Sequence, residues 1–229
     1  EPGKAKHVTV NPDGSIIITE VDTSSIIPPQ LRWIGNGRTI KNNKGNEVKQ
    51  YQPYFSVNWH FEDYKELVES GVTSKMFYDA AGRLIRVEMP DGTFSKIVFD
   101  SWKQTVYDAN DTVLDSSWYH NRNNRLIDAE LIADGKNPER EKIASDKAAK
   151  HANTPQVLHF DTLGRPVLSV DHNKNLTTEA DEFYTTQIKL DTEGNLRTVT
   201  DARGNTVVQY KYDMLGNLVY QKSMDAGQR

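Results

Sequence analysis

Hydrophobic and polar residues alternate over short runs along most of this chain, and turn sequences separate the runs. Near the N-terminus, Val8 and Val10 alternate with polar residues, and a second β-rich run follows over residues 15–21. Between them lies Asn11-Pro12-Asp13-Gly14, in which proline fixes φ and glycine supplies the positive φ that closes a turn. A period of two is that of a half-buried strand, so the first element is predicted to be a hairpin.

The same alternation recurs further along the chain. Val208, Tyr210 and Tyr212 oppose Val207, Gln209 and Lys211 along one run. In an earlier run the pattern places Ile85, Val87 and Met89 on one face, and Leu84, Arg86 and Glu88 on the other. These runs are separated by similar turns, which predicts a long antiparallel meander.

A repeated motif marks the turns. Its copies share a large residue, Asp, two variable residues, Gly, and then Arg or Asn; they span residues 78–83, 160–165, 190–195 and 212–217. A fifth copy at 200–205 lacks the large first residue, 89–93 is a shorter turn, and Phe99-Asp100 and Tyr107-Asp108 resemble degenerate copies without Gly. Self-similarity of this kind indicates a repeat architecture.

The chemistry of the motif explains its form. Aspartate at the first turn position can accept hydrogen bonds from backbone N–H groups two residues on, and the glycine adopts the left-handed conformation that other residues avoid. Arg83 and Arg165 follow the glycine and are expected to support neighbouring strands. The residues predicted to form structural repeat turns are Asp79, Gly82, Arg83, Asp161, Gly164, Arg165, Asp191, Gly194, Asp201, Gly204, Asp213 and Gly216.

Four segments are expected. Residues 1–30 form an N-terminal hairpin and a linker at Ile26-Ile27-Pro28-Pro29, residues 31–120 and 156–229 form repeat β segments, and residues 121–155 form a helical insertion. Within the insertion, residues 126–131 predict a short helix ended by Gly135, and Asn137-Pro138 is a suitable start for a helix over 139–151. A further short helix is predicted at 62–70, ended by Gly71.

Composition narrows the possible classes of protein. The chain has 229 residues, only 36% of them hydrophobic, with a net charge of −4 and no cysteine. It therefore has no disulfide, thiolate metal site or cysteine nucleophile, and no apolar run long enough to span a membrane. The absence of a basic block gives no reason to expect nucleic-acid binding. The start, EPGKAKHVTV, lacks Met and an apolar signal region, so we expect a fragment without a signal peptide.

Catalytic motifs were sought and not found. The sequence contains no GxSxG, HExxH or Walker A pattern, and its six histidines do not pair at metal-ligand spacing. Abundant carboxylates leave a glycosidase pair open, although most aspartates occupy turns. Asp108-Asn110-Asp111 and Asp191-Glu193-Asn195 have spaced oxygen ligands, but fewer than a calcium loop needs. We expect no catalysis, cofactor or metal.

The Tyr-Asp-x-x-Gly-Arg units resemble YD, or RHS, repeats. Four segments in order resemble the repeat region of the B component of bacterial insecticidal toxin complexes (Tc toxins, the SpvB/TcaC-type family): residues 32–56, 78–119, 151–166 and 200–229. The resemblance covers roughly residues 31–229.

The resemblance implies a mainly β fold and a structural role. In the family, repeat strands form a hollow β-shell that is completed by the C component and encloses that component's toxic C-terminal region. A propeller, absent from this chain, docks on the A component. The resemblance thus implies a segment of a secreted virulence factor that works by encapsulation, without catalysis.

A carbohydrate- or cell-surface-binding module is the alternative. Aromatic residues can stack on sugars, and candidates are Tyr51, Tyr54, Trp59, Trp102, Trp118 and Tyr119. This alternative predicts that the aromatics cluster in one accessible groove, whereas the shell predicts that they pack between strands.

Overall fold

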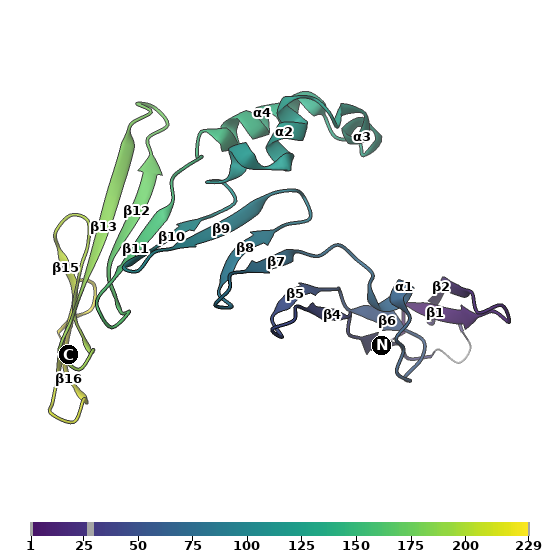
Figure 1. Ribbon diagram of the computed structural model, residues 1–229, viewed down its shortest axis with the longest axis horizontal. Helices are drawn as coiled ribbons and strands as arrows, with labels where there is room; N and C mark the ends of the chain where they lie inside the picture. The colour runs from purple at the N-terminus through teal and green to yellow at the C-terminus, as the bar shows by residue number, and fades with distance from the viewer. Residues whose placement is uncertain (1, 27–29, 229) are drawn as a thin grey trace. The chain divides into compact units, whose positions relative to one another are not determined.

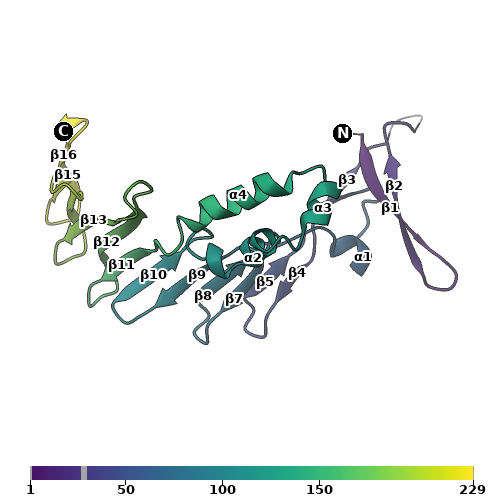
Figure 2. The same ribbon diagram turned by 90° about the horizontal axis from the view of Figure 1, so that it is seen from above.

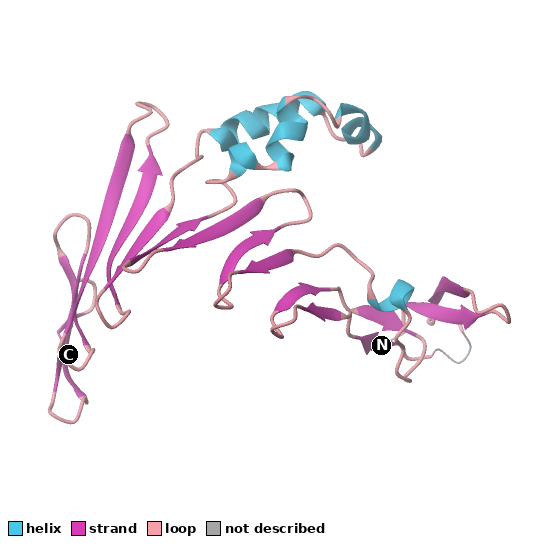
Figure 3. Ribbon diagram, in the orientation of Figure 1, coloured by secondary structure: helices cyan, strands magenta, loops and turns pink. Residues whose placement is uncertain are grey.

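A computed structural model describes residues 2–26 and 30–228. The chain divides into two compact units, Glu1–Pro90 and Asp91–Arg229, each described separately below (Figure 1). Strands predominate in both (Figure 3). The predicted linker at residues 26–29 falls almost entirely outside the described residues.

The first unit is built from short strands. β1 (Lys4–Val10) and β2 (Ile16–Asp22) form the predicted N-terminal hairpin. The sheet order is β2-β1-β6-β3, with β3 at Trp33–Gly35 and β6 at Tyr54–Ser56. Two further hairpins pair β4 (Thr39–Lys41) with β5 (Glu47–Gln50), and β7 (Lys75–Tyr78) with β8 (Leu84–Glu88).

The small core of this unit gathers around one helical turn. Tyr54, Leu67 and Val68 are buried together, and Val8 and Ile18 pack against them. The helix α1 covers only Lys65–Val68, whereas the sequence pattern predicts a helix over 62–70. The N-cap residue, Tyr64, provides no side-chain acceptor, and the backbone leaves the helical region at Glu69, so nothing extends the turn in either direction.

The second unit is an antiparallel meander. Each strand pairs with the next along the chain, so spatial order follows sequence order. The strands are β9 (Phe94–Phe99), β10 (Lys103–Tyr107), β11 (Gln156–Phe160), β12 (Pro166–Lys174), β13 (Asp181–Leu190), β14 (Leu196–Thr200), β15 (Thr206–Tyr212), β16 (Leu218–Ser223) and β17 (Gly227–Gln228). The predicted fold class, a mainly β meander with a helical insertion, is confirmed.

Helices interrupt the meander between β10 and β11. The 3-10 helix η1 (Val113–Asp115) leads into α2 (Ser117–Asn123), α3 (Asp128–Ala133) and α4 (Pro138–Ala149), which Figure 2 shows grouped together. As predicted, Asn137 caps α4, and its side chain accepts hydrogen bonds from the backbone N–H groups of Glu139 and Arg140. Helical structure starts earlier than residue 121, because Ser116 caps α2 by accepting from Tyr119 N–H.

Few side chains are fully buried in the second unit. Among the residues described there, the buried hydrophobic ones are Phe94, Val113, Leu131 and Ala152, and most strand residues are only half-buried. The meander is therefore an open sheet rather than half of a closed sandwich, which accounts for the polar composition.

A β-bulge follows every repeat turn. In the first, Tyr78 pairs with Leu84 but Phe77 pairs with Arg86, so Ile85 is an extra residue. The corresponding extra residues in the other hairpins are Val48, Val167, Arg197, Val207 and Val219. The predicted grouping of Leu84 with Arg86 on one face is therefore wrong, because they pair with residues on opposite faces of β7. The extra residue shifts the alternation by one position.

Candidate functional site in the repeat turns

One aspartate organises each repeat turn. Asp79 Oδ1 accepts hydrogen bonds from the backbone N–H groups of Ala81 and Arg83, both at 2.9 Å. Asp79 Oδ2 accepts from Arg83 Nε at 2.7 Å. Gly82 N–H donates to the Asp79 carbonyl at 3.0 Å, and the φ of Gly82 is 83°. This is a turn closed by a left-handed glycine, with both carboxylate oxygens occupied.

The other copies repeat this geometry. Asp161, Asp191, Asp201 and Asp213 each accept from the backbone N–H groups two and four residues on. Their glycines have a positive φ as well: Gly164 75°, Gly194 96°, Gly204 82° and Gly216 80°. In the last three copies an asparagine replaces the arginine, and its Nδ2 donates to Oδ2 of the aspartate.

The hydrogen bonds stabilise the charged form of these carboxyl groups. The pKa of Asp161 is lowered by the hydrogen bond from the Arg165 side chain and by backbone N–H donors. For Asp79 the backbone N–H of Arg83 is the main cause of the lowered pKa, and its side chain is the next. The pKa of Asp213 is lowered by the Asn217 side chain and then by its backbone N–H. The carboxylates therefore serve as fixed acceptors.

Each arginine that follows a turn glycine forms an ion pair within its own turn. Arg83 and Arg165 were expected to support neighbouring strands, but each forms an ion pair at 2.7 Å with the aspartate of its own turn. Arg165 also lies close to the next turn at the same end of the strands. A Cβ atom added to Gly194 would be 2.9 Å from Arg165 Nη1. The Arg165 guanidinium therefore packs between the β11–β12 and β13–β14 turns.

A further copy of the turn begins with asparagine and is not among the copies of the motif recognised in the sequence. Asn42 Oδ1 accepts from the backbone N–H groups of Lys44 and Asn46, at 2.9 and 3.0 Å, and the φ of Gly45 is 81°. Lys44 Nζ donates to the Ala80 carbonyl, which connects this turn to the first aspartate turn. The signal was the spacing of Asn42, Gly45 and Asn46, which matches the motif once asparagine is allowed first.

The degenerate copy at Tyr107-Asp108 has a different role. Asp108 Oδ1 accepts from the N–H groups of Asn110 and Asp111, and the chain continues into the helices without forming a hairpin. Asp111, which is buried, accepts from Asp108 N–H through Oδ2. Within the described residues no group of three His, Cys, Asp or Glu side chains could hold a metal ion.

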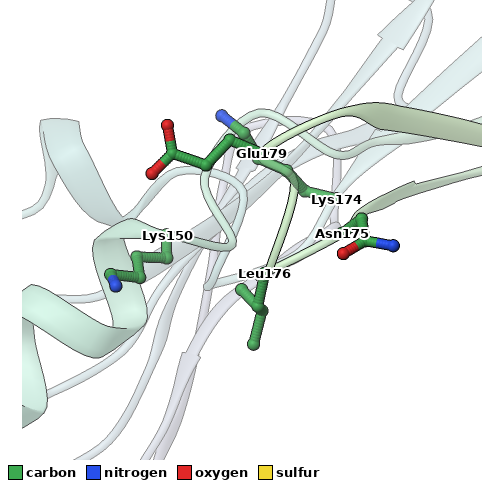
Figure 4. Close-up of a pocket in the computed structure, with 5 residues that line it drawn as sticks. All are labelled: Lys150, Lys174, Asn175, Leu176 and Glu179. Atoms are coloured by element: carbon green, nitrogen blue, oxygen red, sulfur yellow. The ribbon is translucent and has the colours of Figure 1, made fainter.

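A small cavity of about 110 Å³ lies beside the end of α4. It is lined by Lys150, Lys174, Asn175, Leu176 and Glu179 (Figure 4). Its titratable side chains are those of the two lysines and the glutamate. No helix among the described residues is long and apolar enough to cross a membrane.

Comparisons with known proteins agree with this geometry. Residues 191–223, which contain three aspartate turns, match the RHS repeat family. Residues 191–223 therefore carry an RHS repeat. A comparison with curated proteins gives no match.

The whole chain also matches solved structures. These include the crystal structures of TcdB2-TccC3-Cdc42 and of TcdB2-TccC3, with TM-scores of 0.69 and 0.68. A third is the Photorhabdus luminescens Tc holotoxin pore, with a TM-score of 0.67. In each case the identity is 24%, and all of this chain covers 10% of the other. The chain therefore has the same fold as a part of each of these structures and spans about a tenth of the matched chains' length.

The aromatic residues named as possible sugar-binding residues do not gather in one groove within either unit. Tyr54 is buried in the core of the first unit, whereas Trp59 is 70% exposed. In the second unit, Trp102 is exposed in the β9–β10 turn, and Trp118 packs against the Arg122 guanidinium at 4.4 Å. Tyr54 is packed as the shell predicts, whereas the exposed Trp59 and Trp102 are neither packed between strands nor part of one groove.

Proposed function

We propose that this RHS chain is a non-catalytic wall segment of a toxin-complex shell that encloses a toxic polypeptide. The observation that carries the proposal is the open meander, in which each aspartate turn is satisfied by its own neighbours. Such turns fix hairpins side by side, and the carboxylates of the described turn aspartates accept hydrogen bonds from their own turns. The match to Tc toxin structures over the whole chain supports the same role.

Such a wall needs further strands that pair with the edge strands of this sheet. A sheet with a free edge presents unpaired N–H and C=O groups, which favour pairing with additional strands. We propose that these come from the rest of a longer chain and from a partner of the C-component type, as part of a secreted complex. Contact with an A-component partner would be made by parts outside this segment.

The first test concerns the size of the natural protein. Antibodies raised against this segment are used in an immunoblot of the source organism. We expect a band several times larger than 26.0 kDa, the mass of this chain. A band near that mass would contradict a wall segment and favour a free-standing binding module.

The second test concerns enclosure. The native particle is isolated with the same antibodies and treated with trypsin, with and without prior unfolding in urea. We expect a co-isolated polypeptide to resist trypsin only in the intact particle. Equal cleavage in both conditions would contradict enclosure.

A pair of matched variants sharpens this test. Gly164 lies in a repeat turn and Gly135 in the helical insertion, with similar φ values of 75° and 73° and open space around both. We expect Gly164→Val to abolish the protection, whereas Gly135→Val retains it, because only the first opens the sheet. Loss of protection in both variants would contradict a specific role of the repeat turns.

A further inference from the structure

The two faces of the second unit's sheet differ in charge. Cross-strand pairing places Val157, Val170 and Thr185 on one face, with His159, Leu168 and Gln187 beside them. The same face continues through Thr198 and Gln209 to β16. The strand residues of the opposite face include Leu158, Ser169, Thr186, Ile188 and Val199.

Lysines occur on only one of these faces. It is the face of Val157, Val170 and Thr185, which we call the lysine face. Pairing and strand alternation place six lysines on it: Lys96, Lys103, Lys174, Lys189, Lys211 and Lys222. Among the described strand residues, Asp181 is the one carboxylate on the lysine face. On the opposite face, the charged residues of these strands outside the bulges are Asp171 and Glu182.

Three lysines on β13, β15 and β16 are available to a ligand. Lys189, Lys211 and Lys222 are exposed, and none forms an ion pair with a described carboxylate. Lys211 Nζ lies 4.9 Å from the centroid of the Tyr220 ring, a contact that leaves its positive charge without a counter-ion. Thr198 and Gln209 lie between Lys189 and Lys222 in one cross-strand row. Three strand spacings put the two lysines about 14 Å apart, which is about four residues of an extended peptide.

A largely apolar cavity opens on the same face. Tyr107, Val157, Val170, His172 and Phe183 line it, and its volume is about 340 Å³. The Phe183 and His172 rings stack with centroids 4.5 Å apart, and Phe183 remains 61% exposed. The cavity can accept an apolar side chain, which a polar surface would not favour.

The charge near this cavity is already balanced. Asp181 lies opposite Lys174 in the strand register, and its Oδ1 is 3.0 Å from His172 Nε2. The uncompensated positive charge therefore lies further along the sheet, on β13 to β16. A ligand that uses both regions needs an apolar group at one end and negative charges at the other.

We propose that the lysine face is a docking surface for an acidic, extended polypeptide segment that carries an apolar side chain. The carboxylates would contact Lys189, Lys211 and Lys222, and the apolar side chain would enter the cavity beside Phe183. Threonine and glutamine side chains between the lysines can hydrogen-bond a peptide backbone. The valines of the cavity favour an aliphatic or aromatic side chain over a phosphate backbone. This proposal does not depend on the proposed enclosure.

The test uses the complete 229-residue chain and a fluorescent peptide. The peptide combines glutamates spaced four residues apart with one phenylalanine, and its binding is followed by fluorescence anisotropy at low and high salt. We expect the combined variant Lys189→Gln, Lys211→Gln, Lys222→Gln to raise the Kd at least fivefold and to reduce the salt dependence. No measurable binding by the unmodified chain would overturn the proposal.

A matched control removes the same charge elsewhere. Lys136→Gln, Lys147→Gln, Lys150→Gln changes three exposed lysines of the helical insertion, so the net charge changes equally. We expect less than a twofold change in Kd for this variant. Equal weakening by both variants would show that only the overall charge matters, which would overturn the assignment to the lysine face.

Two further measurements test the apolar anchor and the class of ligand. Replacing the phenylalanine of the peptide by alanine should weaken binding to the unmodified chain. The same replacement should not weaken binding to the variant Phe183→Ala, because the cavity side chain is already missing. Phe183 is exposed, so this variant should fold normally. A single-stranded DNA oligonucleotide of the same charge should bind more weakly than the peptide. Tighter binding of the oligonucleotide would overturn the proposal in favour of a nucleic-acid surface.

Discussion

Asp111 joins the two ends of the helical insertion through Thr154. Its Oδ1 accepts from the Thr154 backbone N–H at 2.8 Å and from the Thr154 hydroxyl at 2.9 Å. Its Oδ2 accepts from Asp108 N–H, and its carbonyl accepts from Asn153 N–H. One buried side chain therefore holds the point where the chain leaves the sheet beside the point where it returns.

We expect Asp111→Asn to destabilise the protein by about 1–3 kcal/mol. An amide has only one oxygen, so its NH₂ group would face an N–H donor and leave that buried donor unpaired. The measurement is the free energy of unfolding in denaturant. Asp115→Asn is the control, since Asp115 is exposed, and an equal loss in both variants would contradict a role for the Thr154 contact.

Replacing the arginine of a repeat turn should have an effect that depends on the substitute. We expect Arg165→Asn to cost less than about 1 kcal/mol, because Asn195, Asn205 and Asn217 make the equivalent bond to their own aspartates. Arg165→Leu removes the donor and should cost more. Thermal unfolding of the two variants provides the comparison, and a lower melting temperature for the asparagine variant would refute this interpretation.

The left-handed glycine should be the most sensitive position of a turn. Gly164→Val places a β-branched side chain at a φ of 75°, which should cost about 1–3 kcal/mol. Thr162→Val changes an exposed residue of the same turn that lacks a positive φ, and should alter the melting temperature little. If both variants melted alike, backbone strain would not be the cause.

Acid should weaken the aspartate turns. The pKa values of Asp79, Asp161, Asp191, Asp201 and Asp213 are lowered on folding, so the unfolded chain binds protons first. Their contribution to stability is complete above the ordinary carboxyl pKa of about 4 and is lost as the pH falls through the lowered values. Unfolding in denaturant between pH 7 and pH 2 measures this loss.

The asparagine turn is the internal control for pH. The backbone N–H of Asn46 donates to the neutral Asn42 side chain, whereas that of Arg83 donates to Asp79. NMR should therefore show the Arg83 amide titrating below the usual aspartate pKa, with the Asn46 amide unchanged. Titration of the Arg83 amide at the ordinary aspartate value would be inconsistent with these hydrogen bonds.

The aspartate turns could be predicted because their determinants are local. Asp161 and Gly164 lie in one short segment, and their hydrogen bonds involve only that segment. The asparagine copy at Asn42 was missed because asparagine replaces the expected aspartate. The helix α2 was missed because Trp118 and Tyr119 are typical of strands. The feature that indicates its start is Ser116, whose side chain caps the helix.

Other features depend on residues distant in the sequence. The contact between Arg165 and Gly194 and the closure of the insertion by Asp111 and Thr154 require the strands to be paired first. The charge difference between the two faces of the second unit's sheet could not be deduced from the sequence either. The bulges between Lys189 and Lys222 shift the alternation of inward and outward side chains.

The bulges also bear on how such a chain can change in length. Removing one residue from a strand normally exchanges its inner and outer side chains. Here Val167 is already the extra residue between the pairs Phe160–Pro166 and His159–Leu168. Deleting it would leave both pairs and their faces as they are and would straighten the strand. Each repeat hairpin thus contains one position at which the sequence can shorten without inverting the sheet.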